Sequence, residues 1–293
     1  MAKKVTRKAR KKALCVGIND YGNQNAPEMG IPNLNLKGAV NDAHAWANLL
    51  VRHYNFSVAD VTLLTDAQAT RGNILKGLKD LVVGARSGDV LVFTNSSHGM
   101  FTPDVSGDEE EIEFDIGGKH FKGKFDEAIC PYDYPKLIID DELKEICDEI
   151  PDGVNLTIIS DSCFSGTLTD FNFSKAGTDS GIPGELQYRA LRHPQIVLLT
   201  ASTDRQMSGD MPPDENKGRY DYHGFMTYNA IQTIKDAGYR LTYGELHERM
   251  LERIKTTDDP IYEKYRSQHP QLEASAQSKQ LYIFTTKFKK PGS

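Results

Sequence analysis

Short apolar segments that end on polar residues recur along the chain and alternate with longer amphipathic segments. The apolar segments are rich in Val, Ile, Leu and Phe and lack alternation with polar positions, which is typical of strands buried on both faces. We therefore predict strands at Lys12–Ile18, Val61–Thr65, Val90–Asn95, Leu156–Asp161, Ile196–Ser202 and Leu281–Thr285.

Helical spacing of apolar positions occupies much of the chain between these strands. The predicted helices are Gly38–His53, Thr70–Ala85, Asp140–Ile150, Met226–Ala237 and Thr242–Lys255. Thr70 before Asn73 and Thr242 before Glu245 have the pattern of helix starts, the second as a capping box. The alternation of strand and helix with short links predicts a mostly parallel sheet between two layers of helices.

Two long segments, Thr102–Tyr134 and Thr169–Pro194, interrupt this alternation. Both are long enough to be functional loops rather than simple links. Within the first, Phe114–Cys130 has apolar residues on both sides of Gly117-Gly118, which predicts an added β-hairpin.

The composition is that of an ordinary soluble protein, with 293 residues, 39% of them hydrophobic, and 35 Lys+Arg against 41 Asp+Glu. It excludes collagenous, disordered and disulfide-rich classes. The basic residues are uneven, because Met1–Lys12 holds seven bases and no acid. We expect residues 1–12 to form a disordered basic tail. The acidic remainder argues against a nucleic-acid partner and favours a cation or a basic partner.

Membrane and secretion signals are missing from the pattern. No stretch approaches the roughly 18 apolar residues of a membrane span, and no cleavage pattern follows the basic start. Cys15, Cys130, Cys147 and Cys163 include no Cys-x-x-Cys pair, so neither a zinc knuckle nor a redox dithiol is indicated. We expect a cytoplasmic protein with reduced thiols and no membrane partner.

Two strand ends carry the chemistry. Val90–Phe93 leads to His98-Gly99, and Leu156–Ser160 leads to Cys163. Parallel strands would bring the imidazole and the thiol to the same edge of the sheet. An imidazole that accepts the thiol proton creates a thiolate able to attack a carbonyl carbon. Either residue alone has an ordinary packing or turn explanation, but the pair predicts acyl transfer by a cysteine nucleophile.

The sequence around these residues resembles the metacaspases and bacterial caspase-like cysteine peptidases of family C14. Eight blocks carry the resemblance in the family's order: Ala13–Tyr21, Leu36–Ala43, Asn95–Gly99, Asp126–Tyr134, Ile138–Leu143, Asp161–Gly166, Thr200–Asp210 and Gly224–Ala230. The resemblance implies a caspase-haemoglobinase fold, an α/β fold with a six-stranded, mostly parallel sheet. It also implies His98 as the base, Cys163 as the nucleophile, and an oxyanion hole from the Gly99 and Cys163 amides.

The same resemblance implies a single peptidase domain over residues 13–293. Its large-subunit-like part covers residues 13–170, a loop covers 171–194, and a small-subunit-like part covers 195–293. Metacaspases are usually monomers because added strands cover the edge through which caspases pair, so we expect a monomer.

Two carboxylates near the nucleophile indicate the substrate class. Asp161 precedes Cys163 by two residues, so both point to one side of a strand, and Asp42 lies near the start of the first predicted helix. The resemblance places acids at these two positions with a serine at Ser96, and implies cleavage after Arg or Lys. It also implies that Asp204 and Ser208 contribute to the substrate wall.

Alternatives remain open for these residues. Asp42 could cap its helix and Asp161 could bond a loop amide. Ala39 stands where metacaspases often have cysteine, and Phe164 where they often have histidine. The first change should alter the shape of the pocket, and the second departs from the family pattern beside the nucleophile.

The resemblance further implies a calcium site at Asp126, Asp140, Asp141 and Asp170, since hard cations bind carboxylate oxygens. Some bacterial relatives work without calcium, and Asp140 and Asp141 could simply begin a helix. No organic cofactor is expected.

Together these patterns predict an intracellular cysteine endopeptidase that acts on protein or peptide substrates. Lys175, Arg189 and Arg192 in the second long segment are candidate sites of self-cleavage. Two other classes stay open: a catalytically silent caspase-like scaffold or binding module, and an acyl-transfer enzyme acting on a non-peptide carbonyl.

Overall fold

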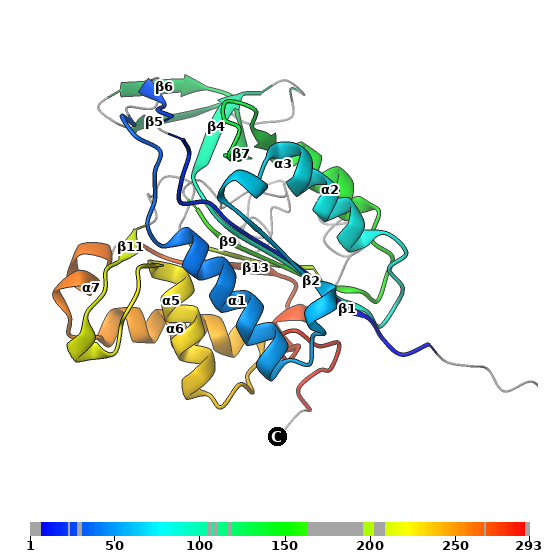
Figure 1. Cartoon of the computed structure of the whole chain (residues 1–293). Helices are drawn as coiled ribbons and strands as arrows, with labels where there is room; N and C mark the ends of the chain where they lie inside the picture. Colours follow the sequence, from blue (N-terminus) through cyan, green and yellow to red (C-terminus); the bar gives the residue numbers. More distant parts are fainter. Residues whose placement is uncertain are drawn as a thin grey trace, which may run out of the picture.

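The fold is built around one six-stranded sheet, seen edge-on in the computed structural model of Figure 1. The structure describes residues 7–22, 24–27, 31–104, 107, 111–116, 119–162, 196–201, 209–266 and 268–290. The strand order is β13-β10-β9-β3-β1-β2. The strands are β1 (Lys11–Gly17), β2 (Val61–Thr65), β3 (Val90–Ser96), β9 (Asn155–Asp161), β10 (Ile196–Thr200) and β13 (Gln271–Ala274).

All neighbouring pairs in this sheet are parallel except β10 with β13, which is antiparallel. The expected six-stranded, mostly parallel sheet is therefore confirmed. Strands β3, β9 and β10 are buried along their whole length, as unbroken apolar segments should be when helices cover both faces of a sheet.

Two layers of helices cover the sheet (Figure 1). One layer contains α1 (Ala39–His53), α5 (Phe225–Asp236) and α6 (Tyr243–Thr256), whose apolar residues form one core with the sheet. The other contains α2 (Arg71–Val82) and α3 (Asp140–Asp148), which form the second core. A further short helix, α7 (Pro260–Tyr265), follows α6.

Local sequence signals explain several of these helix starts. The Thr70 side chain accepts a hydrogen bond from the Asn73 amide at the start of α2, and Thr242 forms the predicted capping box with Glu245 at the start of α6. Such caps satisfy amides that have no partner within the helix.

The segment Leu281–Thr285 is not a strand, which corrects the prediction. It makes only isolated bridges, Thr242 with Tyr282 and Leu281 with Phe288, and the backbone of Phe284 is left-handed with φ 55°. Its apolar residues instead pack into the core shared with α1, α5 and α6. The sixth strand is β13, whose sequence QLEA has no continuous apolar run to reveal it.

The segment Thr102–Tyr134 is mostly strand rather than loop. Strand β4 (Gly99–Pro103) pairs with β7 (Phe125–Ile129), which pairs with β8 (Ile138–Ile139). Strands β5 (Ile112–Ile116) and β6 (Lys119–Gly123) form the predicted hairpin. They make a separate two-stranded sheet, so within the described residues this hairpin does not cover an edge of the central sheet, and the reason we gave for a monomer fails.

The amino-terminal basic segment is shorter than expected. Strand β1 begins at Lys11, so Lys11 and Lys12 belong to the sheet rather than to a tail. Just before it, Arg7 and the Arg10 amide both bond the Asp89 carboxylate. These contacts anchor the described residues that lead into β1.

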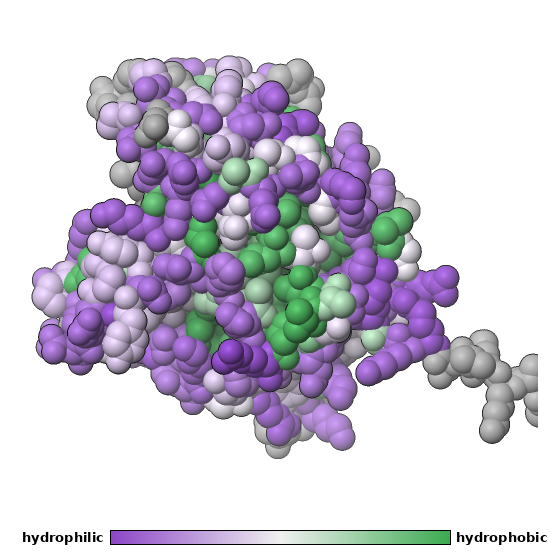
Figure 2. Space-filling model, viewed as in Figure 1, coloured by the Kyte–Doolittle hydropathy of each residue, from purple (hydrophilic) through white to green (hydrophobic). Residues whose placement is uncertain are grey.

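Hydrophilic side chains cover most of the face shown in Figure 2, and apolar ones gather near its middle, over α1 and the edge strand β2.

Within the described part of the chain, no helix is long and apolar enough to span a membrane. Two further short strands, β11 (Asp210–Met211) and β12 (His223–Gly224), pair with each other, and β12 leads directly into α5.

Candidate active site

His98 lies just beyond the end of β3, at the carboxyl edge of the central sheet. Its ring atom Nε2 is 2.8 Å from the backbone carbonyl oxygen of Leu34. A carbonyl oxygen only accepts hydrogen bonds, so Nε2 must carry the proton. The other nitrogen, Nδ1, is then left as the proton acceptor of the neutral ring.

Burial lowers the pKa of His98, and the hydrogen bond to Leu34 partly opposes this effect. The net lowering favours the neutral imidazole at neutral pH. His98 is therefore held in the protonation state and the tautomer that a general base requires.

A second set of hydrogen bonds fixes the His98 backbone. Its amide donates to the hydroxyl of Tyr21 over 3.2 Å, and that hydroxyl donates to the Cys130 carbonyl over 3.1 Å. The Cys130 amide in turn donates to the His98 carbonyl over 2.9 Å. Tyr21 is fully buried, and its ring centroid lies 5.6 Å from that of the imidazole. Both peptide groups that flank His98 are thus clamped.

Sequence reasoning missed Tyr21 and Leu34. Tyr21 ends one of the blocks that carry the family resemblance, so its position could have marked it as a candidate. Leu34 acts through its backbone carbonyl, which no side-chain pattern reveals.

The predicted nucleophile, Cys163, lies outside the described residues. Strand β9 ends at Asp161, and Ser162 is the last residue described before Cys163. Asp204 and Ser208, predicted in the substrate wall, and Asp170, predicted as a calcium ligand, also lie outside the described residues, as does the segment with the candidate self-cleavage sites. Gly99, the other predicted oxyanion residue, opens β4 and is buried beside His98.

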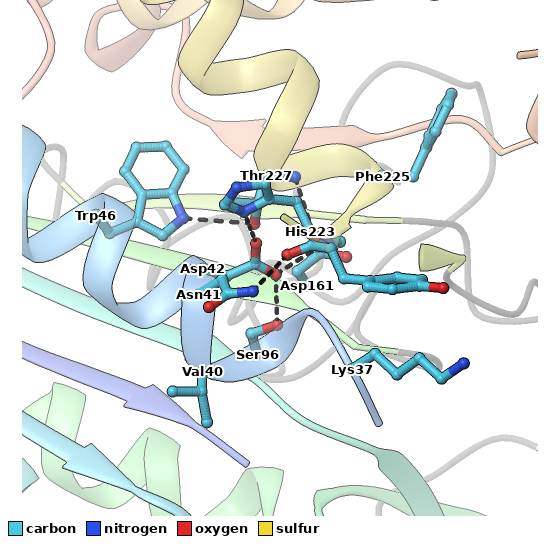
Figure 3. A network of polar contacts seen from close by, with 12 residues as sticks. Lys37, Val40, Asn41, Asp42, Trp46, Ser96, Asp161, His223, Phe225 and Thr227 are labelled. Carbon is cyan, nitrogen blue, oxygen red and sulfur yellow. Dashed lines mark hydrogen bonds and ion pairs between the residues drawn. The ribbon is translucent and has the colours of Figure 1, made fainter. Parts of the chain in front are cut away.

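Asp42 and Asp161 come together near this edge, as Figure 3 shows. Asp42 Oδ2 accepts hydrogen bonds from the Ser96 hydroxyl at 2.8 Å and the Gly224 amide at 2.9 Å. Asp161 Oδ2 accepts one from the Thr227 amide at 2.8 Å. We call Asp42 and Asp161 the carboxylate pair.

The start of α5 stabilises this pair. Gly224 is the N-cap of α5 and Thr227 lies in its first turn, so the positive end of the helix dipole faces both carboxylates. A Cβ atom on residue 224 would lie 2.8 Å from Asp42 Oδ2 and nearer still to Asp161 Oδ2. Glycine is therefore required for the two carboxylates to meet here.

The contacts test the structural alternatives for the two acids. The N-cap of α1 is Gly38, without a side-chain hydrogen bond, so Asp42 does not cap its own helix. Asp161 does bond an amide, but that amide belongs to the start of α5. Asp42 Oδ1 also lies 2.9 Å from Nδ1 of His223, a residue that the sequence analysis did not select.

Burial and the charge of Asp161 shift the acidity of Asp42. Asp42 is wholly buried, and this burial, together with the charge of Asp161, raises its pKa to about 7, although the hydrogen bond from His223 opposes the shift. Burial and Asp161 also raise the pKa of nearby Asp210. A cation placed among these groups would favour their ionised forms.

The pairing of β7 with β8 brings two of the predicted calcium ligands, Asp126 and Asp140, close together in space. Asp140 directly follows Ile139, which pairs with Ala128 of β7, and Asp126 lies two residues before Ala128. Asp140 and Asp141 also open α3. Among the residues that the structure describes, no group of three or more His, Cys, Asp or Glu is placed to hold a metal ion. The described acids alone therefore do not make a calcium site.

The other cysteines are packing residues. Cys15, Cys130 and Cys147 are buried and free, and burial raises the pKa of each to about 12. Their thiolates are therefore scarce at neutral pH, which makes them poor nucleophiles.

Comparison with known proteins places the chain in a family. The family described as "Metacaspase, peptidase C14 domain" matches residues 11–172. Arabidopsis thaliana Metacaspase-4 is 31% identical over 253 residues, which cover 85% of this chain and 50% of that protein. Arabidopsis thaliana Metacaspase-3 is 30% identical, and the match covers 95% of this chain and 75% of the relative.

Other relatives match over a shorter part. Metacaspase-1 of Meyerozyma guilliermondii is 38% identical over 173 residues, 56% of this chain and 37% of its own length. The chain thus spans from about a third to three quarters of these relatives. In fold, it is similar to the crystal structure of protein GSU0716 from Geobacter sulfurreducens, with a TM-score of 0.58, 22% identity and coverage of 90% and 92% of the two chains. From its sequence matches, this chain belongs to the metacaspases of peptidase family C14.

Proposed function

We propose that this metacaspase is a cysteine endopeptidase that cleaves peptide bonds after Arg or Lys, with Cys163 as nucleophile and His98 as general base. Metacaspases are cysteine-type endopeptidases, and family membership supports the reaction class. The observation that carries the substrate class is the buried carboxylate pair at the start of α5.

The proposed reaction begins with proton transfer from the Cys163 thiol to Nδ1 of His98. The thiolate attacks the scissile carbonyl carbon, and the Gly99 and Cys163 amides stabilise the oxyanion of the tetrahedral intermediate. This intermediate collapses as His98 returns the proton to the leaving amine, which departs from an acyl-enzyme. Water, deprotonated by His98, then hydrolyses the thioester and regenerates the thiol.

The geometry around His98 supports its role as base. The Leu34 carbonyl fixes the proton on Nε2 and would stabilise the ring when it becomes doubly protonated, because Nε2 stays a donor in the charged form. The imidazolium could then give up only the Nδ1 proton without losing this bond. In this arrangement, His98 accepts and donates the transferred proton through Nδ1 alone.

The carboxylate pair supports selection of a cationic side chain. Two acids share a site away from bulk water, where a second negative charge is costly unless a cation accompanies it. The guanidinium of Arg or the ammonium of Lys supplies that cation, and Arg can bond a carboxylate through two nitrogens. An acidic substrate side chain would meet repulsion from both groups.

The test is a peptide library with every residue before the scissile bond. We expect cleavage after Arg and Lys only, abolished by Cys163→Ala and retained by the control Cys147→Ala, which removes a buried thiol on α3. Equal activity in Cys163→Ala, or cleavage without preference for Arg or Lys, would contradict the proposal.

We also propose that calcium activates the enzyme through Asp126, Asp140, Asp141 and Asp170. Two observations support this proposal. Asp126 of β7 lies close to Asp140 at the start of α3, and the family resemblance implies a calcium site. Activity should rise on adding calcium and fall with chelator, and Asp126→Asn should weaken this response. Equal activity with calcium and with chelator would remove the calcium proposal but not the peptidase.

Self-cleavage after Lys175, Arg189 or Arg192 is a further proposal that follows from the same specificity. Fragment masses after incubation of the purified chain would show cuts at these positions in the wild type and none in Cys163→Ala. Active enzyme that stays intact would exclude it. The monomer remains a proposal that rests on the family resemblance alone, and sedimentation velocity would test it.

The second candidate is a catalytically silent scaffold, and no feature of the described site favours it, since His98 is held in a base-competent state. A chain that binds Arg peptides but cleaves none of them would support the scaffold instead. Cleavage of an ester or other non-peptide carbonyl with no peptide hydrolysis would support the third class.

A further inference from the structure

A basic depression lies at the amino-terminal edge of the central sheet, at the opposite end of the strands from His98. Its volume is about 350 Å³. Lys11 at the start of β1, His53 at the end of α1, Tyr239 and Arg240 beyond α5, and Tyr282 and Lys287 near the carboxyl terminus line it. We call it the basic pocket. The active-site residues do not line it.

The charge of this pocket is not balanced. Its lining includes Lys11, Arg240 and Lys287 but no Asp or Glu, in a chain where acids outnumber bases. No carboxylate of the described residues forms an ion pair with these three cations. Burial and repulsion by Lys287 lower the pKa of Lys11. Lys11 and Lys287 thus repel each other, and among the described residues no carboxylate balances the three cations.

Contacts hold two of the cations in place. Lys11 Nζ donates to the backbone carbonyls of Tyr54 at 2.8 Å and Phe284 at 3.0 Å, which leaves one of its three N–H groups for another acceptor. The Arg240 guanidinium lies over the Tyr282 ring, 5.4 Å from its centroid. Fixed cations lose little conformational freedom when they bind an anion.

The backbone around the pocket is also unusual. Asn55, Tyr239 and Phe284 have φ values of 58°, 63° and 55°; the first two line the pocket, and Phe284 lies between two lining residues. Asn adopts this left-handed conformation more readily than most residues, but Tyr and Phe rarely do, and such conformations concentrate at functional sites. Three of the four left-handed non-glycine residues in the described chain therefore converge on one depression.

We propose that the basic pocket binds a small phosphorylated ligand that carries two or three phosphate groups. Phosphate oxygens match the donors of Arg and Lys, and one polyphosphate would neutralise all three cations at once. The volume lies within the range of small-molecule sites. A hollow of this size suits a compact anion better than an extended polymer.

The cations also have a simpler explanation, which the test must exclude. Helices α1 and α5 end beside the pocket, and helix carboxyl ends attract positive charge by themselves. That role would need no ligand.

The experiment is isothermal titration calorimetry of the full chain with inorganic triphosphate and, separately, with ATP, at constant ionic strength. We expect binding of triphosphate, weakened roughly tenfold or more by Arg240→Gln with Lys287→Gln, because charge-assisted contacts are lost. ATP that binds more tightly than triphosphate would assign a nucleotide, and equal affinity would assign an inorganic or simple phosphorylated ligand.

The matched control is Lys79→Gln, which removes an exposed cation from the last turn of α2, outside the pocket. It should leave the affinity within about twofold. Circular dichroism and the single variant Lys287→Gln check that a loss of binding does not reflect unfolding. Absence of binding would overturn the proposal. Binding that the double variant leaves unchanged would also overturn it, because the anion would then contact another part of the chain, such as the basic amino-terminal segment.

Discussion

Ser96 and Asp161 are direct partners in the parallel register of β3 and β9. Each lies two residues before a predicted catalytic residue, His98 and Cys163 respectively. The register therefore aligns the two strand ends, and the same register places the Ser96 hydroxyl and the Asp161 carboxylate beside Asp42. One pairing of strands thus positions the carboxyl ends of β3 and β9, from which the chain leads to His98 and to Cys163, and brings two residues of the proposed specificity pocket together.

Loss of the Tyr21 hydroxyl should slow catalysis without weakening substrate binding. Tyr21→Phe removes the acceptor of the His98 amide and the donor to the Cys130 carbonyl, so the imidazole is less well placed. We expect kcat to fall about tenfold or more, with KM for an Arg peptide nearly unchanged. Steady-state kinetics measures both constants.

The control for this change is Tyr132→Phe, which removes a hydroxyl that has no hydrogen-bond partner among the residues that the structure describes. A rise in KM in Tyr21→Phe at constant kcat would show that Tyr21 supports the pocket rather than the base. The rate of Cys163 alkylation against pH would report on the dyad independently of peptide cleavage.

Binding of cationic substrates should depend on the ionisation of Asp42. Because its pKa is about 7, the carboxylate is charged above this pH and protonates below it, so KM for an Arg peptide should rise as the pH falls through 7. Asp161→Asn removes a charge that raises the Asp42 pKa. The midpoint of the KM profile should then move to lower pH, although KM itself increases.

The measurement is KM against pH for both proteins, compared with the kcat profile, which reports on the dyad. A midpoint that stays in place when Asp161 is neutralised would show that the two carboxylates are not coupled.

Replacement of Asp42 should stabilise the fold at the expense of the pocket. A carboxyl whose folded pKa is raised, here from 3.8 to about 7 mainly by burial, favours folding when protonated, and this contribution is lost as the pH rises through the folded value. Asp42→Asn should therefore increase the free energy of unfolding at pH 8, by at most about 4 kcal/mol, and by much less near pH 4.

Urea unfolding at the two pH values tests this, with exposed Asp152→Asn as the control. The prediction is wrong if Asp42→Asn gives the same change at both pH values, since only an ionisable group makes the difference depend on pH.

A methyl group at position 224 should separate the carboxylate pair. The Cβ of Gly224→Ala would overlap the space of both carboxylates, so at least one must move, with a loss of roughly 1–3 kcal/mol of stability and loss of activity on Arg peptides. Gly72→Ala in α2, where a Cβ meets nothing within 4 Å, is the matched control. It should change stability by less than about 1 kcal/mol and leave kcat and KM intact. Tolerance of Ala at 224 with full activity would contradict this view of the site.

The sequence predicted most of the sheet because its strands are buried on both faces. β2 has the predicted bounds, and β1, β3, β9 and β10 differ from theirs by one or two residues, since continuous apolar runs have few other ways to be buried. Capping residues likewise located the starts of α2 and α6. The family resemblance, now shown by the comparisons, rested on short blocks around the strand ends.

The edge of the sheet was harder to predict. The sequence predicted a strand at Leu281–Thr285 and missed the strand β13. An edge strand has a neighbour on one side only and can form without a continuous apolar run, while a buried but irregular segment can be as apolar as a strand. Which of the two segments becomes the edge strand depends on which one the folded chain brings beside β10.

By itself, the sequence determined the central strands, the helix starts, the family, and the residue types available for chemistry, because these depend on local pattern and on short motifs. Only the tertiary structure decided that the Leu34 carbonyl holds the His98 ring, that Tyr21 clamps its backbone, and that α5 brings Gly224 and Thr227 to Asp42 and Asp161. These contacts join residues distant in the chain, and several involve backbone groups that every residue carries. Such interactions exist only once packing has brought the segments together.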